Sequence, residues 1–382
     1  MRRLPVERDP RRPLDPPPAL RGLPPMTRLE MADGHLGWLA TTLDAARAVL
    51  GDPRFSARQE LKHPAVPSSA AVAGPGRPAP PGFFATTDPP EHTRYRRLLI
   101  GEFTVRRMRL LEPRIERIAA DHLDAMAAAG PPADLVTAYA LPIPSMVICE
   151  LLGVPYADHD FFQERSRELV APGGDVAGAS AALRAYLAEL VRRKRAEPGD
   201  DLISGLTGEL ADDAELANVA MILLVAGHET TANMLALGVL ALLTAGLTYE
   251  EGAEEELLRW LSILHLGAPS RAALEDVEVA GVRVAKGETV AVSLPVVNRD
   301  PAAFAAPDEL DPARQDARRH LAFGHGVHQC LGQQLARNEL RIGYRALFDR
   351  FPGLRLAVPA TEVPLRQDAT VFGVGHLPVT WD

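Results

Sequence analysis

The chain has 382 residues, of which 47% are hydrophobic and 24% are charged, and its formal net charge is −9 at pH 7. This composition is that of a globular protein with a large buried core, and the negative charge argues against a general nucleic-acid-binding protein. Its two cysteines, Cys149 and Cys330, are too few for a disulfide framework and suit a reducing cytoplasm.

The N-terminal segment, residues 1–35, is predicted to be an irregular arm, because eight prolines fall among the first 25 residues. It is basic but has no apolar stretch, so neither a signal peptide nor a membrane anchor is expected there. Residues 64–82 are rich in Pro, Ala, Gly and Ser and are predicted to form a long loop.

Beyond the arm, apolar residues at helical spacing predict most of the structure. Expected helices are 44–50, one that begins after Pro90 with a basic face (Arg94, Arg96, Arg97, Arg106, Arg107), 115–129, 144–152, 160–170, 179–195, 213–244 and 331–350. The strand-like signals are short and mostly late, at 277–284, with a turn at Gly281, and at 289–294. We therefore predict a mainly α fold with a small β region, and a single domain over residues 36–382.

The longest apolar stretch, residues 219–243, is long enough to span a bilayer. Its centre, however, contains His228 and Glu229, and a carboxylate at mid-bilayer costs on the order of 3 kcal/mol. The stretch is therefore predicted to be a buried helix with a functional polar centre, capped by Asp212 or Asp213.

The most informative segment is residues 323–332, FGHGVHQCLG. Its first two glycines permit a tight loop, and Cys330 follows at the start of an amphipathic helix, where backbone N–H groups and the helix dipole favour a thiolate. The segment lacks the fourth ligand and paired spacing of a zinc site, and Gln329 interrupts a dinucleotide-binding pattern. A small buried thiol is the alternative if Cys330 is considered by itself.

The segment resembles F-G-x-G-x-H-x-C-x-G, the haem-binding signature of the cytochrome P-450 superfamily. The resemblance implies a prism of helices, triangular in outline, around a buried haem b, with Cys330 as the axial ligand of the iron. Phe323 and Gly324 would form part of the same cofactor-binding loop. Recognisable segments run from about residue 86 to the end of the chain, and residues 44–58 also fit the family.

Two further motifs fit the same family. Glu256 and Arg259 form E-x-x-R on one helix face, a spacing that alone would indicate only a weak surface pair. In the family these residues bond to a downstream arginine, here Arg314, in a buried structural triad that holds the cysteine loop.

Residues 226–231, AGHETT, resemble the oxygen-binding part of the family's long central helix. Small Ala226 and Gly227 would leave room for dioxygen, and the Thr230 hydroxyl can bond to the i−4 carbonyl. Thr230 and Glu229 then offer an alcohol and an acid for proton delivery. His228 either bonds within the core or faces the substrate, and Thr231 is expected to pack or cap locally.

The two haem propionates need cationic partners. By resemblance, one set is His92 and Arg96, four residues apart on one helix face, and the other is Arg271 with His328. The alternative for each of these four residues is an ordinary surface charge.

The resemblance implies a monooxygenase that inserts one oxygen atom of O2 into a hydrophobic small molecule, by hydroxylation or epoxidation, in secondary metabolism. No flavin or nicotinamide motif is present, so electrons from NAD(P)H must come through a ferredoxin reductase and a ferredoxin. We expect an acidic ferredoxin to dock on a basic face near Cys330, and a cytoplasmic monomer without membrane insertion. The arginines of that face are Arg96, Arg97, Arg106, Arg107, Arg318, Arg319, Arg337 and Arg341.

Two alternatives remain. A peroxide-driven haem-thiolate peroxygenase would have an arginine and an acid in place of Glu229 and Thr230, and a haem-binding sensor would need no oxygen groove.

The chain also departs from the family, since the 26 positions from Thr230 to Glu256 are about ten fewer than expected, with the loss around residues 246–252. Substrate contacts are expected from residues 64–84, 160–186, 264–269 and 371–372.

Overall fold

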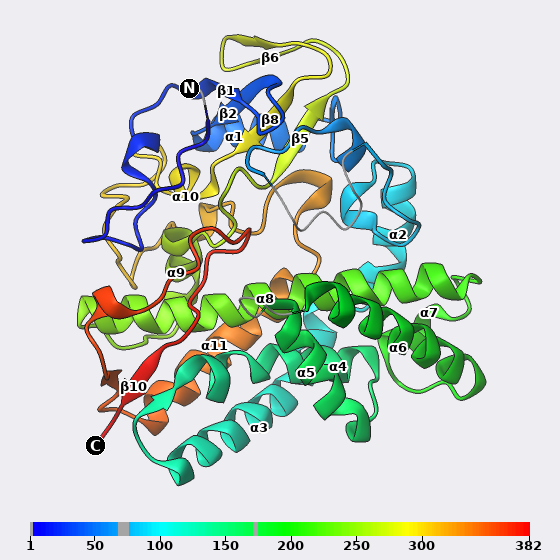
Figure 1. The fold of residues 1–382 in the computed structure, drawn as a ribbon, viewed down its shortest axis with the longest axis vertical. Helices are drawn as coiled ribbons and strands as arrows, with labels where there is room; N and C mark the ends of the chain where they lie inside the picture. The colour runs from blue at the N-terminus through cyan, green and yellow to red at the C-terminus, as the bar shows by residue number, and fades with distance from the viewer. Residues whose placement is uncertain (1–2, 68–75, 171–174) are drawn as a thin grey trace.

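The structure, a computed structural model, describes residues 3–67, 76–170 and 175–382. Its outline is roughly triangular, with a broad helical base and a narrower apex rich in strands (Figure 1). The helices are α1 (Leu43–Gly51), α2 (Glu91–Ile100), α3 (Val105–Ala129), α4 (Pro142–Leu152), α5 (His159–Val170), α6 (Val176–Ala196), α7 (Leu202–Leu206), α8 (Asp213–Ala245), α9 (Ala253–Leu261), α10 (Leu294–Val297) and α11 (Gln333–Arg350).

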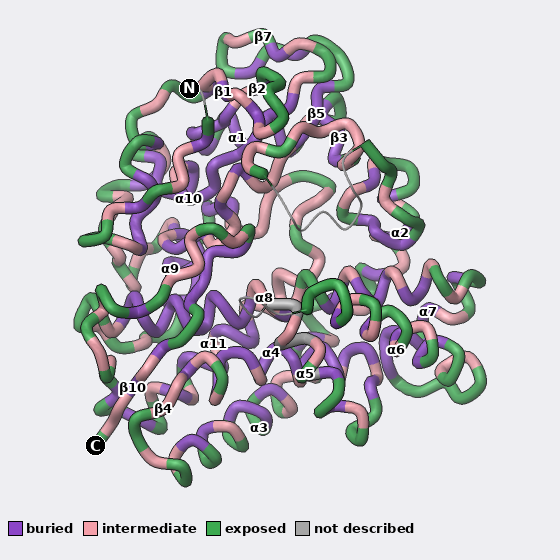
Figure 2. Tube along the Cα trace, viewed as in Figure 1, coloured by how far each residue is buried: buried purple, intermediate pink, exposed green. Residues whose placement is uncertain are grey.

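Helix α8 crosses the whole molecule between base and apex (Figure 1). The Asp212 side chain accepts a hydrogen bond from the Ala214 amide at its start, and Gly246 ends it in the left-handed conformation with φ 67°. By length and composition α8 could cross a membrane, but 67% of its most apolar window is buried inside the protein. It is the buried helix that the sequence predicts, and buried segments concentrate along α8 and α11 (Figure 2).

The main sheet has the order β1-β2-β8-β5-β3. Its central strand β8 (Thr289–Val292) is buried throughout, as its β-branched residues favour, and it runs parallel to β2. Besides β8, its strands are β1 (Met26–Glu30), β2 (Leu36–Ala40), β3 (Phe55–Ser56) and β5 (Ser270–Ala273). A second sheet joins β4 (Ala133–Asp134), β10 (Pro378–Thr380) and β9 (Arg355–Leu356). A third pairs β6 (Val277–Val279) with β7 (Val282–Val284).

The prediction of an irregular arm over residues 1–35 is wrong for its last part. Met26–Glu30 forms strand β1 and pairs antiparallel with β2, and Met26 and Leu29 are buried there. The prolines stop at Pro25, so they leave the amides of this strand available for pairing. The three N-terminal strands were not predicted, because each is too short for a clear period-two pattern.

The helix predictions are confirmed with two corrections. The basic segment after Pro90 is two helices, because Gly101 follows the end of α2 and the Thr104 side chain caps α3. Helix α3 therefore begins ten residues earlier than predicted and contains Pro113 in its interior. Residues 246–252, all of them described, contain no helix between α8 and α9, as the short spacing predicts.

Candidate functional site

The loop before α11 presents Cys330 in a fixed backbone geometry. The Cys330 amide donates to the Phe323 carbonyl at 2.8 Å, and the Gln329 amide donates to the Gly326 carbonyl at 3.0 Å. Gly324 and Gly326 have φ of 72° and 74°. A Cβ on Gly326 would lie 2.5 Å from the Leu50 carbonyl oxygen, so only glycine lets α1 pack against this loop.

The two cysteines lie in contrasting environments. Cys149 is 0% exposed in the core, as expected of a structural thiol. Cys330 is accessible to solvent. The surrounding protein is nevertheless dense enough to raise its thiol pKa, as happens when a side chain faces an internal recess. The Gly332 amide, Arg96 and Arg337 oppose that effect and favour the thiolate.

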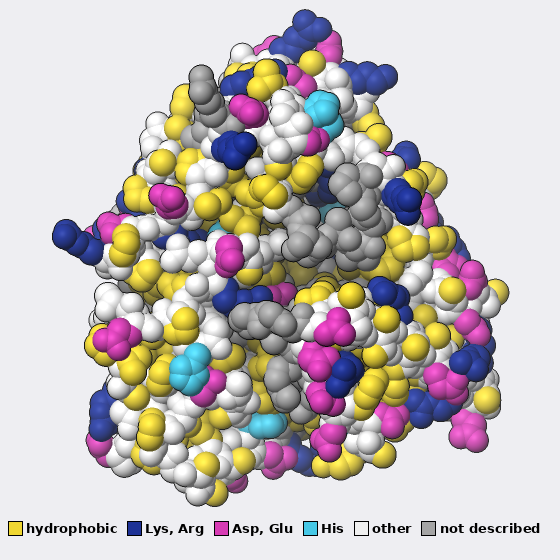
Figure 3. Space-filling view, viewed as in Figure 1, with side chains coloured by type: hydrophobic (Ala, Val, Ile, Leu, Met, Phe, Trp, Pro, Cys, Tyr) yellow, Lys and Arg dark blue, Asp and Glu magenta, His cyan; other side chains and the backbone are white. Residues whose placement is uncertain are grey.

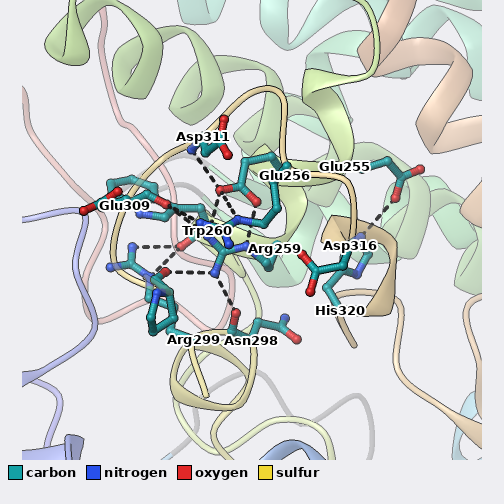
Figure 4. Close-up of polar contacts among 12 residues, drawn as sticks. Glu255, Glu256, Arg259, Trp260, Asn298, Arg299, Glu309, Asp311, Asp316 and His320 are labelled. Carbon is teal, nitrogen blue, oxygen red and sulfur yellow. Dashed lines mark hydrogen bonds and ion pairs between the residues drawn. The ribbon is translucent and has the colours of Figure 1, made fainter. Parts of the chain in front are cut away.

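Glu256, Arg259 and Arg314 form a buried network on α9. Figure 4 shows Glu256 and Arg259 within it. Arg259 is 0% exposed and binds both oxygens of Glu256, at 2.6 and 2.7 Å. Arg314 donates to Glu256 at 3.1 Å, and the remaining guanidinium donors reach the carbonyl oxygens of Asn298, Ala305, Ala306, Pro307 and Glu309. The three side chains therefore fasten residues 298–314, the segment before the cysteine loop, onto α9.

Glu255, the neighbouring residue on α9, was not singled out from the sequence. Its carboxylate lies 3.2 Å from His320 Nε2 and 2.5 Å from Arg337 Nε, and the Arg337 guanidinium lies over the Phe323 ring at 4.5 Å. Burial opposes ionisation, but His320 and Arg337 outweigh it and lower the Glu255 pKa to about 2. Glu255 thus connects α9 to the cysteine loop through Arg337, a contact between distant segments that no local pattern indicates.

The four residues expected beside the propionates gather in one group, in which His92 and Arg271 are buried and Arg96 and His328 are half-buried. The His92 and His328 rings lie 4.2 Å apart, and Arg96 and Arg271 act electrostatically on both imidazoles. Burial first, and then Arg271, His92, Lys62 and Arg96, lower the His328 pKa to about 3. Burial of the Arg271 guanidinium likewise lowers its pKa, to about 10.

Lys62 is a fifth member of this group, and a third cation beside Arg96 and Arg271, that the sequence did not predict. Burial and the charge of Arg271 lower its pKa to about 8. It is one of three lysines in the chain, and this rarity is the only signal that could have drawn attention to it. Asp88 is the nearby carboxylate, and its oxygens already accept hydrogen bonds from Ser56 and the Ala57 amide.

The middle of α8 is open where the rest of the helix is buried. Val225 and Ala226 are exposed in the centre of an otherwise buried helix, and a Cβ on Gly227 would meet only Ile148, at 3.8 Å. The Thr230 hydroxyl donates to the Ala226 carbonyl at 2.7 Å, the i−4 bond that was predicted. Small residues and this hydroxyl therefore lie together on the same open stretch.

Glu229 is paired by a residue that the sequence did not indicate, Arg366, whose Nη2 lies 2.9 Å from its carboxylate. Burial raises the Glu229 pKa, and Arg366 only partly offsets this effect. His228 is buried, and Thr231 donates a hydrogen bond to buried Glu339 on α11, which agrees with a packing role for Thr231.

These residues fit a haem. An anionic ligand would compensate the positive group around His328, and His92 Nδ1 is buried without a hydrogen-bond partner among the described residues. The solvent-accessible Cys330 would supply the thiolate, and Arg96 lies near enough to influence both Cys330 and His328.

Comparisons with known proteins agree with this geometry. Residues 245–379 match the cytochrome P-450 family model. The chain is 51% identical to cytochrome P-450 105C1 of a Streptomyces species, over 95% of this chain and 94% of that relative. It is 49% identical to pentalenic acid synthase of Streptomyces avermitilis, over 97% of this chain and 95% of the relative.

Among solved structures, the chain superimposes on cytochrome P-450 MoxA from Nonomuraea recticatena with a TM-score of 0.90 at 45% identity, covering 100% of this chain and 98% of MoxA. The chain belongs to the cytochrome P-450 family. It is a haem-dependent monooxygenase that acts on a small molecule and takes its electrons from NAD(P)H through redox partners.

Proposed function

We propose that Cys330 is the thiolate ligand of the haem iron and that His92, Arg96, Arg271 and His328, joined by Lys62, bind the propionates. The observation that carries this proposal is the excess of positive charge around His328, where Arg96, Arg271 and Lys62 outnumber the nearby carboxylates of Asp88 and Glu60. Phe323 and Gly324 shape the loop that holds Cys330. Residues 36–382 act as one catalytic domain, to which the N-terminal arm contributes strand β1.

The haem, when bound, supplies the activation of dioxygen. The chain's own residues position the reacting groups and deliver the protons. Ala226 and Gly227 leave space on the open stretch of α8, Thr230 presents its hydroxyl there, and Glu229 holds the proton that Thr230 passes on. Burial raises the Glu229 pKa, and this shift favours the protonated acid that proton delivery requires.

The substrate is a hydrophobic small molecule of terpenoid or polyketide type. Relatives named pentalenic acid synthase and vitamin D3 dihydroxylase support this class. The expected contact segments include residues 68–75 and 171–174, which lie outside the described residues. Within the described ones, Leu264 and Val371 form a bridge and Phe372 is buried against His265, so these two loops act as one unit.

The electron donor is an acidic ferredoxin, itself reduced by a ferredoxin reductase in the cytoplasm, and the enzyme works as a monomer. Charges of both signs are spread over the face in Figure 3, so local groups must guide docking. Arg97 and Arg106 are exposed and have no ion-pair partner among the described residues, whereas Arg337 and Arg341 are bound to Glu255 and Glu112. We therefore assign docking to Arg97 and Arg106, with a contribution from exposed Arg318, whose contact with Glu255 is a long one at 3.6 Å. Ferredoxin affinity should then fall steeply with salt.

The test compares turnover of a hydrophobic compound with ferredoxin, reductase and NAD(P)H against turnover with peroxide alone. The candidate compound is chosen by its spin-state shift on binding. A monooxygenase turns over the compound only, or far faster, with the redox proteins and NAD(P)H. Glu229→Gln should lower kcat about 100-fold, whereas exposed Glu250→Gln should leave kcat unchanged. Turnover driven by peroxide alone and insensitive to Glu229→Gln would identify a peroxygenase, and haem binding without turnover a sensor.

A further inference from the structure

A second group of side chains with metal-ligand chemistry lies apart from Cys330. Asp33 and His35 belong to the turn between β1 and β2, and His63 follows the short helical turn Gln59–Leu61. Their possible ligand atoms all lie within 4.8 Å of one another. In the ranges 3–67, 76–170 and 175–382, this is the one group of at least three His, Cys, Asp or Glu residues placed so closely.

The two imidazoles direct the same ring nitrogen at one carboxylate. His63 Nδ1 lies 2.6 Å from Asp33 Oδ2, and His35 Nδ1 lies 3.2 Å from Asp33 Oδ1. The rings are stacked, with centroids 3.8 Å apart and an interplanar angle of 22°. Two nitrogen ligands and one carboxylate therefore lie close together, and a cation that draws them inward could replace the protons that now join them.

Backbone hydrogen bonds hold the two contributing segments in place. The Met31 amide donates to the His35 carbonyl at 2.7 Å, which closes the turn, and the Ala32 amide donates to the Pro64 carbonyl at 2.8 Å. The His63 amide donates to Thr289 Oγ1 on β8 at 2.9 Å. Because the backbone of both segments is already ordered, binding a metal would cost little conformational entropy.

We propose that Asp33, His35 and His63 form a surface Zn²⁺ site, with water as the fourth ligand. Two imidazoles and one carboxylate match the ligand types and the number of protein ligands in open zinc sites. Mg²⁺ and Ca²⁺ prefer all-oxygen ligands, so they should not compete at millimolar concentration. Asp33 and His35 are exposed and His63 is half-buried, which gives the ion direct access from solvent.

The site is structural. It joins the β1–β2 turn to the segment that carries Lys62, the residue next to His63 that faces the buried cations around His328. A bound Zn²⁺ would therefore restrain both segments and raise the melting temperature in proportion to its occupancy. This inference does not depend on the proposed reaction, and its test uses no turnover.

The experiment titrates ZnCl2 into untagged, haem-loaded enzyme after chelator treatment and dialysis, at pH 7.5 with excess Mg²⁺, using calorimetry and thermal unfolding. We expect one Zn²⁺ per chain in a saturable transition and a rise in melting temperature. Asp33→Asn, His35→Gln and His63→Gln should each weaken binding by more than about 10-fold. His376→Gln is the matched control, because His376 pairs with Asp134 at 3.1 Å without a second imidazole.

Circular dichroism and the haem Soret band establish that each variant is folded. A crystal soaked with ZnCl2 should give an anomalous peak at the zinc edge between the three side chains. The proposal is overturned if Zn²⁺ does not bind, if it binds equally well to the Asp33 and His63 variants, if His376→Gln abolishes binding, or if the anomalous peak lies elsewhere.

Discussion

Two groups of buried charge in this protein differ in one respect, their balance. Around Glu256, two guanidinium groups surround a carboxylate, and backbone carbonyl oxygens accept the remaining donors (Figure 4). Around His328, two arginines and a lysine lie close to two imidazoles whose pKa values are lowered. The two nearby carboxylates already have partners, Asp88 in Ser56 and the Ala57 amide and Glu60 in Arg58. We call the first group balanced, because each nitrogen of its two guanidinium groups has an acceptor, and the second unbalanced, because its cations outnumber the carboxylates near it. The balanced group can hold the fold by itself, whereas the unbalanced group favours a further anion.

The largest expected effect comes from breaking the balanced group. Glu256→Gln keeps the shape of the side chain but leaves Arg259 and Arg314 buried without a counter-charge. We expect the free energy of unfolding to fall by about 3–5 kcal/mol, with loss of bound haem at a lower urea concentration. Glu309→Gln is the control, because only the backbone of Glu309 takes part. Equal urea midpoints for the two variants would contradict the structural role.

Removing a cation from the unbalanced group should weaken haem binding without destabilising the haem-free protein. Arg271→Met keeps volume but removes one partner of the anion, so haem transfer to apomyoglobin should accelerate about 10- to 100-fold. The haem-free protein should not lose stability, because repulsion among the cations is relieved. Arg54→Met, which removes an exposed ion pair with Asp52, should change neither quantity. A destabilised haem-free protein with unchanged haem transfer would assign Arg271 to the fold.

The smallest effect concerns Glu255, the second balanced acid. Its folded pKa of about 2 lies below its ordinary value of 4.5. The carboxylate therefore stabilises the fold above about pH 5, and this contribution disappears as the pH falls towards 2. Glu255→Gln should flatten the pH dependence of stability in that window by on the order of 1–2 kcal/mol, after allowance for screening. Exposed Glu251→Gln should retain the wild-type slope, and an unchanged slope in Glu255→Gln would argue against the ion pairs with His320 and Arg337.

The sequence predicted the parts of the site that are local in the chain. The loop around Cys330, the pair Glu256 and Arg259, and the stretch from Ala226 to Thr230 each lie within one turn or helix, so each forms a short motif that a family resemblance can reveal. Helix α8 was predicted for the same reason, since its apolar run is long and continuous.

The residues that were missed reach the site through tertiary structure. Lys62 lies outside any regular element, Arg366 comes from the C-terminal region, and Glu255 acts through Arg337 on another helix. Strand β1 was missed because the prolines before it dominate the composition of the arm, and its five residues do not alternate between buried and half-buried positions. None of these contacts leaves a periodic signal, so only the folded chain reveals them.

The most direct test of the central claim is the reduced carbon monoxide difference spectrum of the wild type, Cys330→Ser and Cys149→Ala. We predict the thiolate-type Soret band in the wild type and in Cys149→Ala, whose cysteine is buried in the core, and its loss in Cys330→Ser. Absence of that band from the wild type, or its persistence in Cys330→Ser, would contradict the assignment of Cys330 as the haem ligand.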